Sequence, residues 1–156
     1  MEGDWDFSEG QRMFRQLTDT IFVAPQIGVA DVDRAKAMGI SVILNNRPDD
    51  EESGQTNGAA IEAAARAAGI GYAAVPVTHG GFAPWQLDGM DEALQAASAG
   101  KLLAYCRSGT RSTLLWALAR ARAGESPDTL AATAAAAGYD LTPVRQIMDA
   151  LAADKG

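Results

Sequence analysis

Cysteine and histidine are almost absent from this sequence, whose 156 residues contain one cysteine, Cys106, and one histidine, His79. A single cysteine excludes an internal disulfide framework and fits a reducing compartment. The scarcity of both residue types also argues against a zinc or transition-metal site, because such metals are held by clusters of imidazoles and thiolates. The sequence therefore implies neither a metal nor a cofactor.

Positive charge is also scarce. The chain has 13 lysines and arginines against 20 aspartates and glutamates, a net charge of −7 and a pI near 4.6. Nucleic acids and anionic membranes are poor partners for so acidic a chain. The acidic N-terminus lacks the pattern of a signal peptide, and the alanine-rich runs carry too many charges to span a membrane. We expect a cytoplasmic protein that binds neither nucleic acid nor membranes.

Hydrophobic periodicity and glycines divide the chain into alternating strands and helices. A helical segment, a glycine and an apolar strand follow one another three times, which predicts an α/β fold with a small, mostly parallel sheet flanked by helices. We expect an N-terminal arm over 1–17 and a single domain over 18–156. The expected strands are 20–24, 40–44, 70–77 and 101–105, and the expected helices are 30–38, 57–68, 84–99, 112–123, 127–137 and 143–154.

Several polar loops follow expected strands, and ligands of open α/β sheets bind beyond the carboxyl ends of the strands. These loops should therefore line one cleft. They are 45–54, 78–83 and 106–111. The side chains expected to meet in the cleft are Arg47, His79, Cys106 and Arg111.

The segment from Cys106 to Arg111 joins a buried strand to the start of a helix. Unpaired N–H groups and the helix dipole favour an anion there, and the arginines should favour the reactive thiolate of Cys106. Gly109 lets the backbone curl so that N–H groups face inward, and Arg111 can pair bidentately with an oxyanion above the sulfur. We expect Cys106 and Arg111 to be catalytic. The expected anion-binding residues are Arg107, Ser108, Gly109, Thr110 and Ser112.

The segment Cys106-Arg107-Ser108-Gly109-Thr110-Arg111 resembles the active-site loop of rhodanese-type sulfurtransferases, in which the cysteine carries a persulfide. The surrounding chain is similar to dual-specificity, cysteine-dependent phosphatases, because 72–79 resembles the strand before their general-acid loop. From about Phe14 to Ala152 the pattern most resembles the beta-lactamase-hydrolase-like, phosphatase-like domain family, some members of which are called sulfur transferases. The segments 22–26 and 45–49 also carry this resemblance. It implies a dual-specificity protein tyrosine phosphatase-like fold with three C-terminal helices.

Two departures from the phosphatase pattern favour sulfur transfer. Phosphatases of this type place five residues between cysteine and arginine, whereas here four intervene and Ser112 stands where their arginine would be. His79 occupies the position of their general-acid aspartate. An alkoxide leaving group gains about two to four powers of ten in rate from a general acid, whereas sulfite or a thiolate leaves with much less help.

We therefore predict a sulfurtransferase that moves sulfane sulfur from thiosulfate or a small persulfide, through a Cys106 persulfide, to glutathione, sulfite or cyanide. The family resemblance suggests a persulfide dioxygenase as a partner. One alternative is a cysteine-dependent phosphatase with a phosphocysteine, in which His79 or Asp88 would serve as the acid. Another is a sensor in which Cys106 registers reactive sulfur or oxidants.

Each of the possible accessory residues His79, Asp88 and Arg47 has two interpretations. His79 either orients substrate or has no role, and Asp88 is more often a solvated helix residue than an acid. Arg47 either adds charge at the rim of the cleft or pairs with Asp49 or Glu51. We interpret the carboxylates at 49–52 as a solvated loop, since no histidine or cysteine cluster accompanies them.

Overall fold

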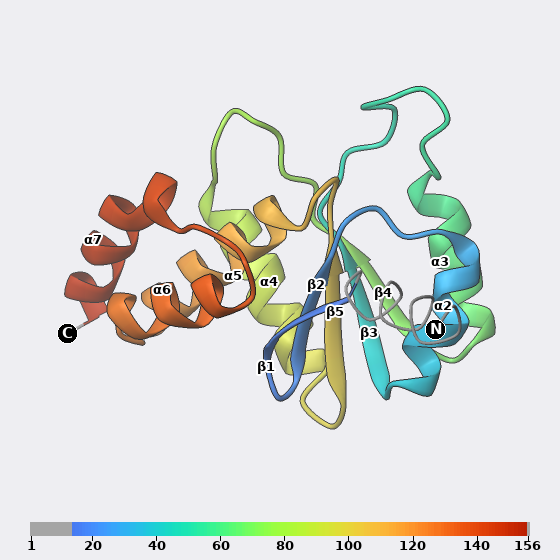
Figure 1. Ribbon diagram of the computed structural model, residues 1–156, viewed down its shortest axis with the longest axis horizontal. Coiled ribbons are helices and arrows are strands. Elements are labelled where there is room, and N and C mark those ends of the chain that lie inside the picture. The colour runs from blue at the N-terminus through green and yellow to red at the C-terminus, as the bar shows by residue number, and fades with distance from the viewer. Residues whose placement is uncertain (1–13, 156) are drawn as a thin grey trace, which may run out of the picture.

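The computed structural model describes residues 14–155, in which strands and helices alternate along the chain (Figure 1). Within this range no helix is both long enough and apolar enough to cross a lipid bilayer. The elements are β1 (Arg15–Thr18), β2 (Ile21–Ala24), α2 (Val29–Ala37), β3 (Ile40–Asn45), α3 (Gly58–Ala67), β4 (Gly71–Ala74), α4 (Pro84–Ala96), β5 (Lys101–Tyr105), α5 (Thr110–Arg122), α6 (Pro127–Ala136), the 3-10 turn η1 (Thr142–Val144) and α7 (Arg145–Lys155).

The sheet has five strands in the order β1-β2-β5-β3-β4. Strands β2, β5, β3 and β4 run parallel, and β1 pairs with β2 in the antiparallel sense. Strand β5 lies at the centre, and four of its five residues are buried. A continuous apolar run is what a parallel strand covered on both faces requires. The prediction of a small, mostly parallel sheet is confirmed.

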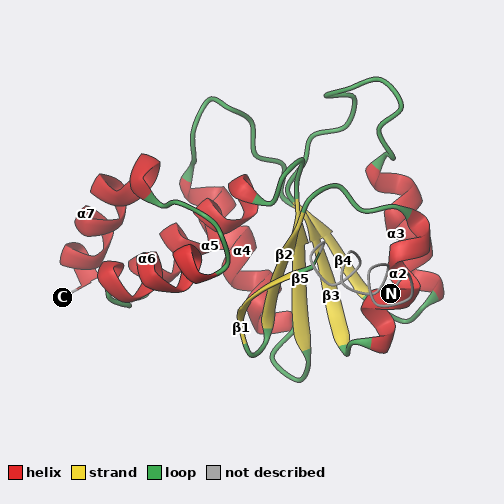
Figure 2. Cartoon of the chain, viewed as in Figure 1, coloured by secondary structure: helices red, strands yellow, loops and turns green. Residues whose placement is uncertain are grey.

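Helices cover both faces of the sheet (Figure 2). Helices α2 and α3 lie on one side, α4 and α5 on the other, and α6 and α7 lie beyond α5. Successive side chains of β5 enter opposite cores: Leu102 and Ala104 pack with residues of α4 and α5, and Leu103 and Tyr105 pack with residues of α2 and α3. Burial on both faces holds the strand in register, and this register places Cys106 at its carboxyl end.

The predicted alternation of helix, glycine and strand recurs in the structure. After α3, Gly69 adopts a φ of +77°, and its N–H donates to the carbonyl of Arg66 at 3.1 Å. Glycine adopts this left-handed conformation without the steric cost of a Cβ atom. The chain therefore reverses within two residues and enters β4 beside β3.

Several boundaries differ from the prediction, and three of the differences have bearing on the fold. Residues 15–17 of the expected arm form the edge strand β1 together with Thr18, while 1–13 lie outside the described residues. The expected strand 70–77 is assigned only over Gly71–Ala74, although the N–H groups of Val75 and Val77 still donate to the carbonyls of Asn45 and Asn46 at 2.9 Å. The final helix begins at Arg145, after the 3-10 turn that contains Pro143.

Candidate active site

Cys106 lies directly after β5, in a loop that curls into the start of α5. The cysteine is fully buried, and the N–H of Gly109 donates to its Sγ at an N···S distance of 3.1 Å. Gly109 precedes α5 with a φ of +91°, a conformation that favours glycine over any residue with a side chain. The sulfur therefore sits against an inward-facing amide at the positive end of a helix dipole.

The carbonyl groups of this loop are bonded from outside it. The N–H of Gln26 donates to the carbonyl of Arg107 at 3.3 Å, and Tyr139 Oη donates to that of Ser108 at 3.1 Å. The carbonyl of Gly109 accepts from both the N–H and Oγ1 of Thr113. These bonds fix the orientation of three peptide groups of the loop, because each of the three carbonyl oxygens has a partner outside it.

Arg111 lies in the first turn of α5 and is held by partners from two other loops. Its guanidinium donates to both carboxylate oxygens of Glu51, at 2.7 and 2.8 Å, and to the carbonyl of Val77 at 2.6 Å. These bonds use both Nη1 protons and one Nη2 proton, and among the described residues no partner is found for the Nε proton or the second Nη2 proton. The loop over 45–54 and the Val77 carbonyl, which directly precedes the loop over 78–83, therefore both reach Arg111.

Glu51 also bridges Arg111 to a second arginine. Arg47 donates from Nε to Glu51 at 2.8 Å, from Nη2 to Glu52 at 3.0 Å and from Nη1 to Gln26 at 3.0 Å. The hydrogen bond from Arg111, followed by that from Arg47, lowers the pKa of Glu51 to about 2 against the opposing effect of burial. The same hydrogen bond raises the pKa of Arg111. Both arginines are therefore charged and paired.

Two interpretations of the loop over 45–54 are settled by these contacts. The Arg47 side chain is only 2% exposed, so it is a buried ion-pair partner and not a charge at the rim. The loop over 49–52 is exposed, as predicted. Within it Glu51 pairs with Arg47, as one of the two alternatives held, and also with Arg111, which the sequence analysis did not foresee. The spacing of four residues between Arg47 and Glu51 was the available signal, although it says nothing of Arg111.

Ser112 supports the loop from below. Its Oγ donates to Oδ1 of Asn46 at 2.8 Å, and Nδ2 of Asn46 donates to the carbonyl of Val75 at 2.9 Å. Both side chains are completely buried. Because the single hydroxyl proton of Ser112 is committed to Asn46, this residue ties α5 to the end of β3 and does not offer a donor to an anion.

Arg107, Ser108 and Thr110 form the exposed rim of the loop. The Arg107 side chain is 67% exposed, and its Nη2 lies 4.0 Å from Oε2 of Glu52. Ser108 Oγ donates to Oγ1 of Thr110 and accepts from the Thr110 N–H. Arg107 is thus an exposed positive charge at this rim, and the two hydroxyls stabilise the turn into α5.

The two candidate acids lie in different surroundings. His79 is exposed, two residues beyond the Val77 carbonyl that Arg111 binds. Asp88 lies on α4 and accepts a hydrogen bond at 2.9 Å from Arg122, in the last turn of α5. Arg122 is about 18 Å along the helix from Thr110 at 1.5 Å per residue, so Asp88 is not placed at the Cys106 loop.

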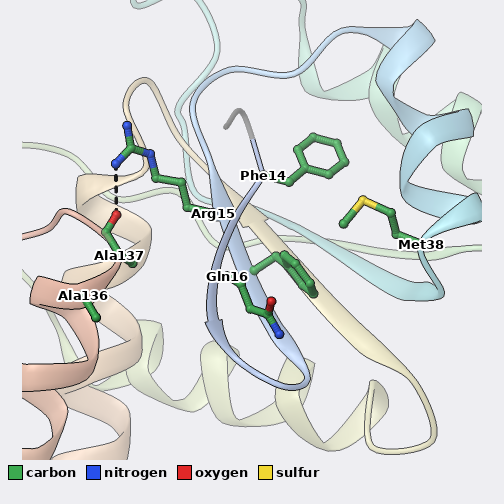
Figure 3. Close-up of a pocket in the computed structure, with 7 residues that line it drawn as sticks. Phe14, Arg15, Gln16, Met38, Ala136 and Ala137 are labelled. Carbon is green, nitrogen blue, oxygen red and sulfur yellow. Dashed lines mark hydrogen bonds between the residues drawn. The ribbon is translucent and has the colours of Figure 1, made fainter. Parts of the chain in front are cut away.

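The site is also separate from a groove beside β1. A groove of about 550 Å³ lies beside β1 (Figure 3), but its lining contains no residue of the Cys106 loop. Chemistry and not volume therefore identifies the candidate active site. Among residues 14–155, no group of three or more histidines, cysteines or carboxylates is arranged to bind a metal.

Comparison with known proteins identifies the family. Residues 13–123 match the model of the beta-lactamase hydrolase-like protein, phosphatase-like domain. The chain belongs to this family. A beta-lactamase hydrolase-like protein of Xylella fastidiosa is 38% identical over 104 residues, which are 66% of this chain and 24% of the relative. The chain thus spans about a quarter of the length of the curated relatives that it matches.

Solved structures of the phosphatase-like domain fold resemble the whole chain. A candidate phosphatase from Neisseria meningitidis is 32% identical, with a TM-score of 0.75 over 90% of this chain and 98% of that one. TpbA of P. aeruginosa, solved in complex with phosphotyrosine, is 13% identical, with a TM-score of 0.65 over 94% and 91% of the two chains. The predicted dual-specificity phosphatase-like fold with three helices after the cysteine loop is confirmed.

Proposed function

We propose that this phosphatase-like domain is a cysteine-dependent phosphatase that hydrolyses phosphate monoesters through a phosphocysteine on Cys106. The observation that carries the proposal is the position of Sγ, which receives the Gly109 N–H at the N-terminus of α5 with Arg111 clamped on the following turn. The description of the family as phosphatase-like, and the phosphotyrosine bound to the distant fold relative, both support it.

The reaction follows from the geometry of the loop. The Cys106 thiolate attacks phosphorus, the bond from phosphorus to the ester oxygen breaks, and that oxygen leaves with the electron pair. The positive end of α5 and the free protons of Arg111 stabilise the charge on the non-bridging oxygens. Water then attacks the phosphocysteine, which releases inorganic phosphate and restores the thiolate.

The leaving group decides how well this site can work. Glu51, Glu52 and Asp88 are each paired with an arginine, so none of these carboxylates is poised to protonate a departing oxygen. We expect aryl phosphates with acidic phenols to react much faster than alkyl phosphates, by about two to four powers of ten, which is the usual contribution of a general acid. Comparable rates for the two classes would show that an acid, with His79 the candidate, acts in the site.

Sulfur transfer is the second candidate, and the same shortage of a poised acid favours it. The thiolate would attack the outer sulfur of thiosulfate, the S–S bond would break, and sulfite would leave with the electron pair. A thiol acceptor would then take the outer sulfur and release Cys106 as thiolate. Because the family and the fold support phosphate chemistry, this order reverses the prediction made from the loop sequence. The persulfide dioxygenase partner belongs to this second candidate.

One experiment separates the candidates. The protein is incubated with p-nitrophenyl phosphate and, separately, with thiosulfate followed by glutathione. The samples are quenched with acid, and the mass of the intact protein is measured by mass spectrometry. Cys106→Ser and Arg111→Lys serve as variants, since lysine keeps the charge but not the bidentate geometry. Phosphatase action predicts turnover of the aryl phosphate, a phosphoryl mass gain on Cys106 and loss of both in the variants.

Three other outcomes contradict this function. A gain of one sulfur atom that glutathione removes, without turnover of the aryl phosphate, supports sulfur transfer. A stable adduct on Cys106 without turnover of either substrate supports the sensor. Turnover of the aryl phosphate that survives in Cys106→Ser overturns the covalent route.

A further inference from the structure

Tyr139 contacts the active-site loop from a part of the chain that lies beyond the family match. It follows α6, and its Oη donates to the carbonyl of Ser108 at 3.1 Å across 31 positions of sequence. The side chain is largely buried, with the residue only 9% exposed. Burial raises the pKa of Tyr139 above its ordinary value, so the phenol keeps its proton and acts as a donor.

The carbonyl that Tyr139 binds belongs to the same peptide group as the amide that faces the sulfur. The Ser108 carbonyl and the Gly109 N–H flank one planar trans peptide bond, in which the two groups point in opposite directions. When Tyr139 holds the oxygen outside the loop, the N–H must point inward, where it donates to Cys106 Sγ at 3.1 Å. Rotation of this peptide plane would break both hydrogen bonds together.

The position of Tyr139 is fixed by how α6 ends. Gly138 has a φ of +95°, its N–H donates to the carbonyl of Ala135, and the Tyr139 N–H donates to that of Ala134. This pair of bonds is the Schellman motif that terminates many helices. The backbone of Tyr139 is therefore held by α6 itself, independently of the Cys106 loop.

Arg15 of β1 holds the aromatic ring. Its guanidinium carbon lies 5.5 Å from the centre of the Tyr139 ring, and its Nη1 donates to the carbonyl of Ala137 at 2.9 Å (Figure 3). A cation over an aromatic face at this distance is attractive. On the other side the fit with the loop is close, because a Cβ atom on Gly109 would lie 2.2 Å from Tyr139 Oη.

We propose that Tyr139 is a positioning residue of the active site, whose hydroxyl locks the peptide group between Ser108 and Gly109 with its N–H directed at the Cys106 thiolate. The inference rests on the proposed role of Cys106 as nucleophile. It means that the end of α6 and the edge strand β1 help to orient the amide that faces the sulfur.

The test removes one oxygen atom. In Tyr139→Phe we expect the ultraviolet absorbance of the thiolate at neutral pH to fall and kcat for p-nitrophenyl phosphate to fall about three- to tenfold, the effect of one hydrogen bond, with KM little changed. Cys106 is the only cysteine, so Cys106→Ser supplies the baseline for the absorbance. Tyr72→Phe is the matched control, because it also removes a hydrogen-bonded tyrosine hydroxyl, which in this case accepts from Nδ2 of Asn45 at 3.0 Å.

The thiolate signal requires no substrate, so the proposal is tested even if the aryl phosphate is not turned over. An absorbance in Tyr139→Phe equal to that of the unmodified protein, or an equal loss in Tyr72→Phe, overturns it. If Tyr139→Phe does not fold, Arg15→Met tests the proposal instead. It keeps the hydroxyl of Tyr139 but removes the cation over its ring and the hydrogen bond to Ala137. A partial fall in thiolate absorbance is then expected, and an unchanged absorbance overturns the proposal.

Discussion

Replacement of Glu51 by glutamine tests the central ion pair of the site. Glutamine keeps the shape of the side chain but removes the negative charge that Arg111 and Arg47 share. The side chains of these arginines are only 10% and 2% exposed, so water can do little to replace the lost partner. Loss of one member of a buried pair is costly because the other charge remains in a poorly solvated position.

The size of the effect follows from the lowered pKa of Glu51, from 4.5 to about 2. One pKa unit corresponds to about 1.4 kcal/mol, and solvent that reaches the 20% exposed carboxylate weakens the interaction. We expect the free energy of unfolding at neutral pH to fall by about 1–2 kcal/mol, with a Tm lower by about 2–8 °C. We expect kcat to fall by about 10- to 100-fold as Arg111 loses its bidentate support.

The pH dependence distinguishes this mechanism from a general loss of packing. Because the pKa of Glu51 is lower in the folded than in the unfolded protein, its contribution is complete above pH 4.5 and disappears as the pH falls towards 2. The difference in unfolding free energy between the native protein and Glu51→Gln should therefore shrink across this window. Other carboxylates titrate in both proteins and cancel in the difference.

Urea unfolding at neutral pH and near pH 3, about the middle of this window, measures the difference. Glu52→Gln is the matched control, since Glu52 also pairs with Arg47 but its side chain is 52% exposed. Its cost should be much smaller than that of Glu51→Gln, as for most surface pairs. A difference for Glu51→Gln that is constant with pH, or a cost for Glu52→Gln of the same size, would refute the reasoning.

Three further substitutions probe the loop and its supports. Gly109→Ala should lower both Tm and kcat, because φ is +91° and the new Cβ would lie 2.2 Å from Tyr139 Oη; thermal melting and turnover equal to those of the native protein would contradict the described loop. Ser112→Ala should cost about 1–3 kcal/mol in urea unfolding, since it leaves buried Oδ1 of Asn46 without its donor. His79→Ala should leave turnover of p-nitrophenyl phosphate unchanged, because this side chain is exposed and the leaving group needs little protonation; a steady-state assay that shows a large loss would identify His79 as the acid.

Local sequence patterns were sufficient to predict most of the helices and strands and the position of Cys106. Helical spacing, helix-ending glycines and the apolar run of β5 are properties of neighbouring residues, and they placed Cys106 at a strand end before a helix. The edge strand β1 was missed because four residues with exposed Arg15 and Gln16 carry little periodic signal. Its strand conformation depends on pairing with β2.

The ranking of phosphatase before sulfurtransferase could be made only once the family and the fold were known, because the loop sequence alone resembles that of sulfurtransferases. The supports of the site needed the tertiary structure. Glu51 and Arg111 are 60 positions apart, Asn46 and Ser112 are 66 apart, and Tyr139 reaches back 31 positions to Ser108.

The amino-acid sequence by itself determined where Cys106, the proposed nucleophile, stands, because a strand, a glycine loop and a helix N-terminus are specified by adjacent residues. Only the tertiary structure decided which carboxylate holds Arg111 and which hydroxyl holds the peptide behind the sulfur. The physical reason is that these partners come from separate segments, and the packing of those segments against the sheet brings them within hydrogen-bonding distance.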